Sequence, residues 1–461
     1  MDTPVNARPQ GCRLWGRRAA LLGAAALVAG CDTITDATDR LLGTRKEPLP
    51  GSRAPVLSAQ RTLGVDASAQ ARPFTLPAPV VNTAWTTPGG NAGHAPGHLA
   101  LARPLGEVWR SSIGTGTGYR QRMTAPPLVE GETVYAMDAM GRVSALDIAR
   151  GSRRWQRDTR PEDSRGGALG GAMALHEGSL YVVTGMAEVM ALDPATGEIR
   201  WRAPMPSAAR GGIAVAGGRI LVPNIENNVV AFSTQDGSRA WSFRGTPVQA
   251  LMLGQPSPAV DGDIAVMGLA SGEIVALRVA DGRTVWTESL GMARSGAPSL
   301  SDISAITAMP VIDRGRVHVT SVGGTSASLD LRSGRRVWER DVGGPVTVAA
   351  AGDWVWLLSR EAELICMGRE DGRIRWITAL PSFGDPDRRR DPILYGPPVL
   401  GGGRLLLTSS TGQAIEVDAD AGEIIARSRL PSGCTLQPAL ALEGAYLLVD
   451  SGSVVALRGV G

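Results

Sequence analysis

A short motif recurs eight times along the chain and constrains the fold more than any other feature. In its fullest form it runs from Gly141 to Trp155: a Gly, an alternating run ending Ala-Leu-Asp, a Gly four residues after the Asp, and a Trp four residues after that Gly. The copies begin at positions 141, 187, 227, 272, 324, 362, 412 and 452. The mean step of 311/7, about 44 residues, suits a four-stranded propeller blade and is too long for most helical or leucine-rich repeats.

The residue order inside each copy predicts antiparallel strands. Residues 143–147 alternate with the period of two that is typical of a strand. The Gly after the Asp can adopt a positive φ in a tight turn, and the Trp offers a large flat surface to the neighbouring blade. Seven tryptophans are therefore predicted to dock one blade on the next: Trp109, Trp155, Trp201, Trp241, Trp286, Trp338 and Trp376. Ala426 stands where the eighth is expected.

The two ends of the repeat array complement each other. The eighth copy stops at Gly461, before its outer strand, and an orphan strand with Trp109 precedes the first complete copy. Pairing these ends closes the ring and leaves no long unpaired edge. We therefore predict an all-β fold over residues 105–461: an eight-bladed β-propeller of four-stranded antiparallel blades, closed by an N-terminal strand that completes the C-terminal blade.

The first 104 residues are predicted to direct the export of this propeller and to tether it to a membrane. Residues 1–30 are predicted to form a signal peptide, because arginines precede an apolar run, Ala19 to Ala29, that is too short to span a bilayer. The run ends Val-Ala-Gly-Cys, which resembles the bacterial lipoprotein box and makes Cys31 the expected site of lipid attachment; an ordinary signal peptide is the alternative. Residues 31–104, rich in Pro, Gly, Ala and Ser, are expected to form the lipidated N-terminus and a flexible tether.

Composition and local motifs exclude several functions. Lys+Arg 47 against Asp+Glu 44 gives a net charge of +3, and no basic stripe interleaved with aromatics indicates a nucleic-acid partner. His94 and His98 are expected in a surface loop rather than at a metal, since Ala-Pro-Gly separates them. The Gly-rich run at 113–118 precedes no helix and is not expected to hold phosphate. No nucleophile with its base is recognisable.

Two cysteines remain within the propeller. Cys366 replaces the Ala of a repeat strand and is expected to be buried in the core, while Cys434 lies in the last connection between blades. A disulfide between them is possible in an oxidising compartment, but we expect two free thiols, since they are far apart in the repeat pattern.

The connections from each Trp strand to the next inner strand vary most in length and should all emerge on one face, which makes that face the candidate binding surface. One such connection presents Leu251, Met252 and Leu253, and the connection one blade later carries Leu300, Asp302 and Ile303. Consecutive apolar residues there favour a partner site formed by both loops. The alternative is that these apolar residues pack over the mouth of the propeller.

The charged run at 383–391 is expected to be a solvated face.

The repeat resembles the tryptophan-docking motif of quinoprotein-type eight-bladed propellers. With the lipobox Cys31, a tether and little else, the chain looks like a member of the BamB family of outer-membrane protein assembly lipoproteins. That resemblance implies no enzyme activity and no cofactor. It implies a scaffold of the β-barrel assembly machinery that docks on the POTRA domains of BamA, meets unfolded β-barrel substrates, and lies on the periplasmic face of the outer membrane.

Residues can be carried over from that family only in part. Its docking loops, with Leu-x-Leu-Arg and Leu-Ser-Asp-x-Asp patterns, correspond to residues 251–253 and 300–302, with Leu253 where the family has Arg and Ser304 where it has the second Asp. Asp32, directly after the lipobox Cys, favours inner-membrane retention in enteric bacteria.

Two alternatives to a BamB-like scaffold remain. One is a quinone-dependent dehydrogenase or quinone-binding relative, although no Cys-Cys pair occurs. The other is a polysaccharide-binding lipoprotein, which an aromatic-lined channel would favour.

Overall fold

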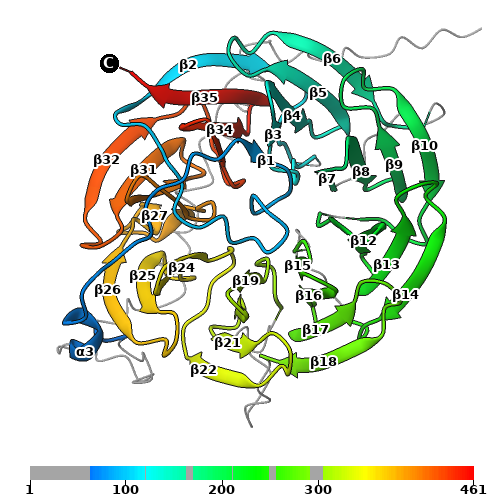
Figure 1. Cartoon of the computed structure of the whole chain (residues 1–461). Coiled ribbons are helices and arrows are strands. Elements are labelled where there is room, and N and C mark those ends of the chain that lie inside the picture. Colours follow the sequence, from blue (N-terminus) through cyan, green and yellow to red (C-terminus); the bar gives the residue numbers. More distant parts are fainter. Residues whose placement is uncertain are drawn as a thin grey trace, which may run out of the picture. The chain divides into compact units, whose positions relative to one another are not determined.

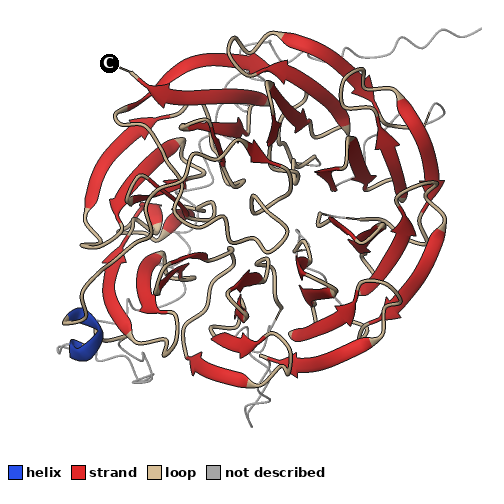
Figure 2. Ribbon diagram, viewed as in Figure 1, coloured by secondary structure: helices blue, strands red, loops and turns tan. Residues whose placement is uncertain are grey.

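The computed structural model describes residues 63–119, 121–161, 170–209, 211–248, 256–290 and 305–460. Eight antiparallel sheets surround a central axis, each turned so that one strand lies inside and one at the outer rim (Figure 1). Nearly all of the regular structure is strand (Figure 2). The predicted eight-bladed propeller of four-stranded blades is confirmed.

Each blade is built from consecutive strands, ordered from the inner strand to the outer one. Blade 1 consists of β3 (Leu128–Glu130), β4 (Thr133–Met137), β5 (Arg142–Asp147) and β6 (Arg153–Asp158), and blade 2 of β7 (Gly171–His176), β8 (Ser179–Thr184), β9 (Glu188–Leu192) and β10 (Ile199–Pro204). Blade 3 consists of β11 (Ala214–Ala216), β12 (Arg219–Pro223), β13 (Asn228–Ser233) and β14 (Arg239–Arg244), and blade 4 of β15 (Ala259–Asp261), β16 (Ile264–Gly268), β17 (Glu273–Arg278) and β18 (Thr284–Ser289).

Blades 5 to 8 follow the same order. Blade 5 consists of β19 (Val311–Asp313), β20 (Arg316–Thr320), β21 (Ser326–Asp330) and β22 (Arg336–Arg340), and blade 6 of β23 (Ala349–Ala351), β24 (Trp354–Leu358), β25 (Glu363–Gly368) and β26 (Ile374–Ala379). Blade 7 consists of β29 (Val399–Gly401), β30 (Arg404–Thr408), β31 (Gln413–Asp418) and β32 (Ile424–Arg429), and blade 8 of β33 (Ala439–Ala441), β34 (Gly444–Val449), β35 (Ser453–Gly459) and β2 (Leu105–Ser112). The remaining elements are helix α3 (Ala67–Gln70), strand β1 (Ala84–Trp85) beside β3, and a hairpin of β27 (Phe383–Asp385) and β28 (Arg390–Pro392).

Blade 8 is completed by the N-terminal strand, as predicted. β2 pairs antiparallel with β35 from Leu105 opposite Gly459 to Ser112 opposite Ser453. The two strands lie side by side at the top of Figure 1. This ladder joins the two ends of the propeller and removes the long edge that an open ring would expose.

Seven of the eight contacts between blades use the same tryptophan arrangement. The indole Nε1–H of each Trp donates to the carbonyl of the residue that follows the Asp-equivalent position in the next blade. These donor and acceptor pairs are Trp109–Ile148, Trp155–Pro194, Trp201–Thr234, Trp241–Val279, Trp286–Leu331, Trp338–Arg369 and Trp376–Ala419, at 2.7–3.2 Å. The ring also covers the repeat Gly of that blade, where an added Cβ would lie 2.5–2.8 Å from ring atoms.

The contact between blades 7 and 8 is built differently. Ala426 occupies the Trp position, and the residue paired with it on β31 is Glu416. The carboxylate of Glu416 accepts from the guanidinium of Arg404, and both side chains are buried. Arg404 also donates to the carbonyls of Leu101 and Ala102. These carbonyl contacts help offset the desolvation cost of a buried ion pair.

The segment Leu63–Pro104, which we call the strap, is not a tether. It packs on the propeller, so the predicted domain boundary at residue 104 is wrong, and the ordered unit begins at Leu63. On blade 6, the Phe74 ring stacks on Trp354 with centroids 5.4 Å apart, and the guanidinium of Arg375 lies 5.1 Å from the Trp354 ring. The sequence shows no period in this segment because the strap forms isolated contacts rather than a ladder.

The strap then crosses the centre of the ring (Figure 1) and bonds to the inner strands of five blades, or to the residue that follows them. Backbone N–H groups of these residues donate to strap carbonyls at 2.7–2.8 Å. The pairs are Leu442–Asn82, Leu175–Thr86, Val260–Ala92, Ile312–Gly93 and Gly402–Leu99. The strap therefore covers one end of the central channel and links blades that do not touch each other.

Replacing one repeat glycine tests the docking geometry. Gly282→Ala places a Cβ 2.5 Å from the Trp241 ring at a φ of +71°, whereas Gly262→Ala, at a φ of +59°, meets no atom within 4 Å. Both substitutions strain the backbone. We expect the free energy of unfolding to fall by about 1–3 kcal/mol more for Gly282→Ala, because only that Cβ overpacks an interface between blades. Urea unfolding followed by circular dichroism measures the difference, and equal losses would contradict the docking role.

Candidate functional site

A cup of about 390 Å³ lies at the end of the central channel opposite the strap's contacts. Every blade contributes to its wall, in most cases with residues that immediately precede the inner strand. Among them are Met123, Thr124, Gly212, Ser257, Met309, Thr347, Tyr395 and Gln437. The outer-to-inner connections therefore meet at this mouth, which agrees with the expectation that they all emerge on one face.

The floor of the cup is formed by the strap. Pro88 lines it, and the adjacent Gly89 N–H donates to Oε1 of Gln437 at 2.8 Å. The channel is thus a blind cup on this side rather than a pore. Tyr395 is the one aromatic residue among the described lining residues, and its hydroxyl donates to the carbonyl of Pro381. The described wall therefore lacks the aromatic platforms that a polysaccharide site would use.

The predicted partner-binding residues lie outside the described residues. These are Leu251, Met252, Leu253, Leu300, Asp302 and Ile303. The ends of both loops are described, however, and three of these four ends lie at the turn between β16 and β17. Thr246, before the first loop, donates to Glu273, and Ser257 after it is buried in the cup wall.

The second loop is anchored at both ends by the same turn. Leu290 N–H donates to Gly272 and Ile306 N–H donates to Leu269, and both side chains are buried. The Ile306 side chain lies against Gly268, where a Cβ would be 2.2 Å away. The roots of the two loops are therefore held together on blade 4, at the rim of the cup.

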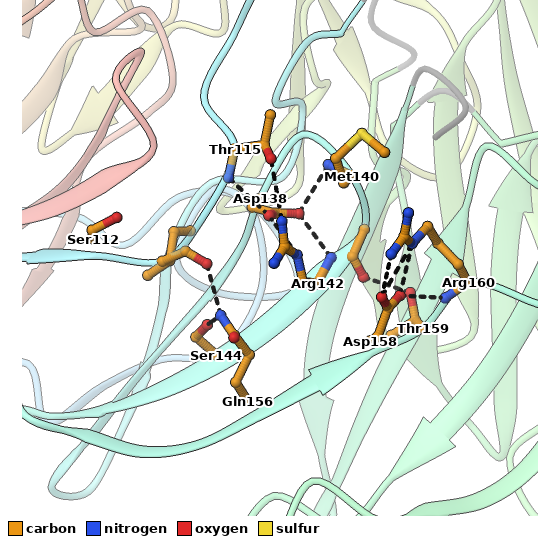
Figure 3. Close-up of polar contacts among 12 residues, drawn as sticks. Ser112, Thr115, Asp138, Met140, Arg142, Ser144, Gln156, Asp158, Thr159 and Arg160 are labelled. Atoms are coloured by element: carbon orange, nitrogen blue, oxygen red, sulfur yellow. Dashed lines mark hydrogen bonds and ion pairs between the residues drawn. The ribbon is translucent and has the colours of Figure 1, made fainter. Parts of the chain in front are cut away.

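The Gly-rich run at 113–118 serves ring closure. Figure 3 shows the buried carboxylate of Asp138 accepting from the backbone N–H groups of Thr115, Met140 and Arg142, and from the Arg142 side chain. A Cβ at Gly116 would lie 2.1 Å from the carbonyl oxygen of Asp450. The Asp138 carboxylate thus binds the Thr115 N–H of this run, and the glycines allow close backbone approach between blades 8 and 1.

Two histidines differ from the expected surface loop. His94 is buried and its Nδ1 lies 2.7 Å from the carbonyl oxygen of Pro310, so the ring donates to blade 5. His98 is half-buried between the Pro77 carbonyl and the Gly403 N–H, at 2.7 and 2.8 Å. The sequence interpretation of a surface loop was wrong because both rings attach the strap to the propeller. Neither contacts a metal-binding cluster, since no group of three or more potential ligands occurs in the described residues.

Burial alters the acid–base behaviour of two imidazoles. Desolvation lowers the pKa of His94 to about 4, partly countered by its bond to Pro310. His318, on β20, lies 6.0 Å from the Trp338 ring, and neither of its nitrogens has a hydrogen-bond partner in the described structure. Desolvation, together with repulsion from nearby arginines, lowers the pKa of His318 to about 3. Both rings are neutral at pH 7.

The two propeller cysteines are free and buried, as expected. Burial raises the pKa of the Cys366 thiol well above its usual range and that of Cys434 to about 12. Neither thiol is poised for nucleophilic chemistry, because a reactive cysteine needs a thiolate at ambient pH. In the described residues, no helix has the length and apolar character needed to cross a membrane.

An eight-bladed ring with tryptophan docking, N-terminal closure and a cup at one end of its channel defines a propeller of the quinoprotein type. A quinohaemoprotein alcohol dehydrogenase from Comamonas testosteroni shares this fold, with a TM-score of 0.64 and 14% identity over 82% of this chain and 81% of that one. The crystal structure of BamB from Moraxella catarrhalis gives a TM-score of 0.65 and 19% identity over 77% of this chain and 99% of that one.

Sequence comparison distinguishes between these relatives. The profile of the family described as outer membrane protein assembly factor BamB matches residues 102–169 and 139–378, which is more than half of the chain. The outer membrane protein assembly factor BamB of Yersinia pestis is 26% identical over 360 residues, covering 76% of this chain and 88% of the relative. The chain belongs to the BamB family of outer membrane protein assembly factors.

The buried histidines predict a pH dependence of stability. Their pKa values are lowered in the folded state, so the unfolded chain, with a pKa near 6.5, binds protons that the folded chain does not. Stability is therefore full above pH 6.5 and falls as the pH drops towards 4. Each histidine should account for about 2 kcal/mol between pH 6.5 and pH 5.

The variant His318→Phe keeps a ring against Trp338 and removes one of these groups. We expect the loss of unfolding free energy between pH 7 and pH 5 to be about 2 kcal/mol smaller in His318→Phe than in the parent protein. Urea unfolding at both pH values measures this, and comparing the two proteins cancels the contributions of all other titrating groups. An identical loss in the two proteins would show that His318 is not buried in its neutral form.

Proposed function

We propose that this protein is a non-catalytic scaffold lipoprotein of the β-barrel assembly machinery. It docks on the POTRA domains of BamA and assists the insertion of β-barrel proteins into the outer membrane. Membership of the BamB family carries this proposal, since its relatives are named outer membrane protein assembly factors. The two buried thiols, whose raised pKa values keep them protonated, agree with a scaffold rather than an enzyme that uses a cysteine nucleophile.

The docking surface we propose consists of the loops with Leu251, Met252 and Leu253 and with Leu300, Asp302 and Ile303. Support comes from their anchored ends: the first loop starts beside the β16–β17 turn of blade 4, and the second loop starts and finishes at that turn, so a partner can contact both at once. A rigid β-scaffold beneath two adjacent loops limits the entropy that binding must overcome.

The quinone-dependent alternative finds little support in the described part of the cup. Its described lining residues include no Asp or Glu, so they offer no carboxylate ligands for a cation beside a quinone. The likeness to the Comamonas dehydrogenase concerns the fold alone at 14% identity.

Charged substitutions in the first loop test the docking surface. The fragment Asp32–Gly461 carrying Leu251→Glu and Leu253→Glu should bind the periplasmic domains of its own BamA at least tenfold more weakly, because two charges must be desolvated in an apolar contact. Val108→Glu, at an exposed position on β2 across the ring, serves as the matched control and should bind normally. Surface plasmon resonance measures both. Failure of the parent fragment to bind would reject the proposal, and equal binding by all variants would reject the site.

We also propose that Cys31 carries the lipid that holds the protein on the periplasmic face of the outer membrane. In cells fed labelled palmitate, Cys31→Ala should lose the label and leave the membrane fraction, while Cys12→Ala, within the signal peptide, should keep both. Density-gradient separation of the two membranes then shows whether Asp32 causes retention in the inner membrane. Label retained in Cys31→Ala would contradict the anchor.

A further inference from the structure

The wall of the cup contains three polar side chains that are almost completely buried. Gln437, Thr347 and Ser257 are 8%, 3% and 2% exposed. Each uses its oxygen to accept a backbone N–H: Gly89 for Gln437, Met309 for Thr347 and Ile213 for Ser257, at 2.8, 2.9 and 3.2 Å. An amide has two N–H donors and a hydroxyl has one, and these donors remain available among the described residues. Each of the three side chains therefore keeps at least one hydrogen-bond donor, beside a second lone pair on its oxygen.

Arg122 adds a positive charge at the same cup. It is exposed, lines the cup, and takes part in none of the ion pairs of the described residues. Its charge acts on Asp450, whose pKa is nevertheless raised, because desolvation outweighs the hydrogen bond with Thr117 and the attraction of Arg122. Because no described lining residue is acidic, the polar part of the cup is suited to a negatively charged acceptor.

The remaining wall is apolar. Met123, Met309, Val346 and Leu436 line it, and Leu394 stands at the cup with 51% of its surface exposed. Methionine side chains adapt to apolar groups of different shape. The volume of about 390 Å³ lies in the range of small-ligand sites, and the strap closes the floor. An inorganic anion would leave this apolar surface exposed to water, whereas an uncharged apolar molecule would leave buried donors unpaired.

We propose that the cup binds a carboxylate that bears an apolar group. The carboxylate contacts Arg122 and the free amide hydrogens of Gln437, and the apolar group lies against the methionines. Two sources share this chemistry: a free aliphatic acid, and the C-terminal residue of a polypeptide with an apolar side chain. None of the residues that carry this proposal is among the loop residues proposed to dock on BamA, so the two proposals can be tested independently.

Isothermal titration calorimetry of the lipid-free protein tests the proposal with matched probes. One pair is octanoate and octan-1-ol, and the other is a pentapeptide ending in leucine with a free or an amidated C-terminus. We expect at least one carboxylate probe to bind, and its uncharged counterpart to bind at least tenfold more weakly, since a charge-assisted contact is lost. Binding of octanoate alone identifies a free acid, and binding of the peptide alone identifies a chain terminus. No binding by either carboxylate, or equal binding of charged and uncharged probes, would overturn the proposal.

Three variants place the binding in the cup. Gln437→Glu keeps the oxygen that accepts from Gly89 but replaces the donor with an anionic oxygen, and Arg122→Gln removes the charge. Each should weaken the carboxylate probe about tenfold or more. Arg283→Gln, with an exposed side chain in the β17–β18 turn, is the control and should bind like the parent. Circular dichroism confirms folding, and unchanged affinity in both cup variants would show that the probe binds elsewhere.

Discussion

The hydrogen bond from a tryptophan indole to a carbonyl of the next blade is the interaction on which the ring depends. It fixes how far each blade is rotated from its neighbour, because the same ring must also cover a glycine that has no Cβ. At some contacts a second donor reaches the same carbonyl, as Tyr135 does beside Trp155 at Pro194 and Trp356 beside Trp376 at Ala419. A repeated local bond thus becomes a global constraint, since eight equal rotations must close.

Closure also shows where the repeat is broken. The contact between blades 7 and 8 lacks the tryptophan; beside Ala426, blade 7 holds the buried Arg404–Glu416 pair, and Arg404 also bonds to the strap. The strap then covers one end of the channel. The opposite end remains open as the cup, beside the roots of the two long loops. The two faces of the ring are therefore unequal, and the open face is the one to which both proposed binding functions belong.

The two proposed sites differ in how visible they are in the sequence. The loop at 251–253 is recognisable because three consecutive apolar residues interrupt a connection that should be exposed, and the loop at 300–303 follows in the connection one blade later. The cup residues carry no such signal: Arg122, Thr347 and Gln437 are far apart in the chain and belong to three different connections. They meet only because every connection returns to the central axis before its inner strand begins. Likewise, the Ala-Pro-Gly between His94 and His98 predicts a loop in the sequence. Both rings are covered only because the strap packs on the blades to which they bond.

The sequence by itself determined the blade count, the strand order, the docking tryptophans and the closing strand, because each follows from a period of about 44 residues and from what is missing at its two ends. It also predicted that Cys366 is buried, whereas the burial of Cys434 and the free state of both thiols came from the structure. The tertiary structure alone decided that residues 63–104 form a strap, that a buried ion pair forms in blade 7 where the eighth tryptophan is missing, and that a cup lined by donors exists. The physical reason is range. Repeats encode contacts between neighbouring blades, whereas these features join single residues hundreds of positions apart.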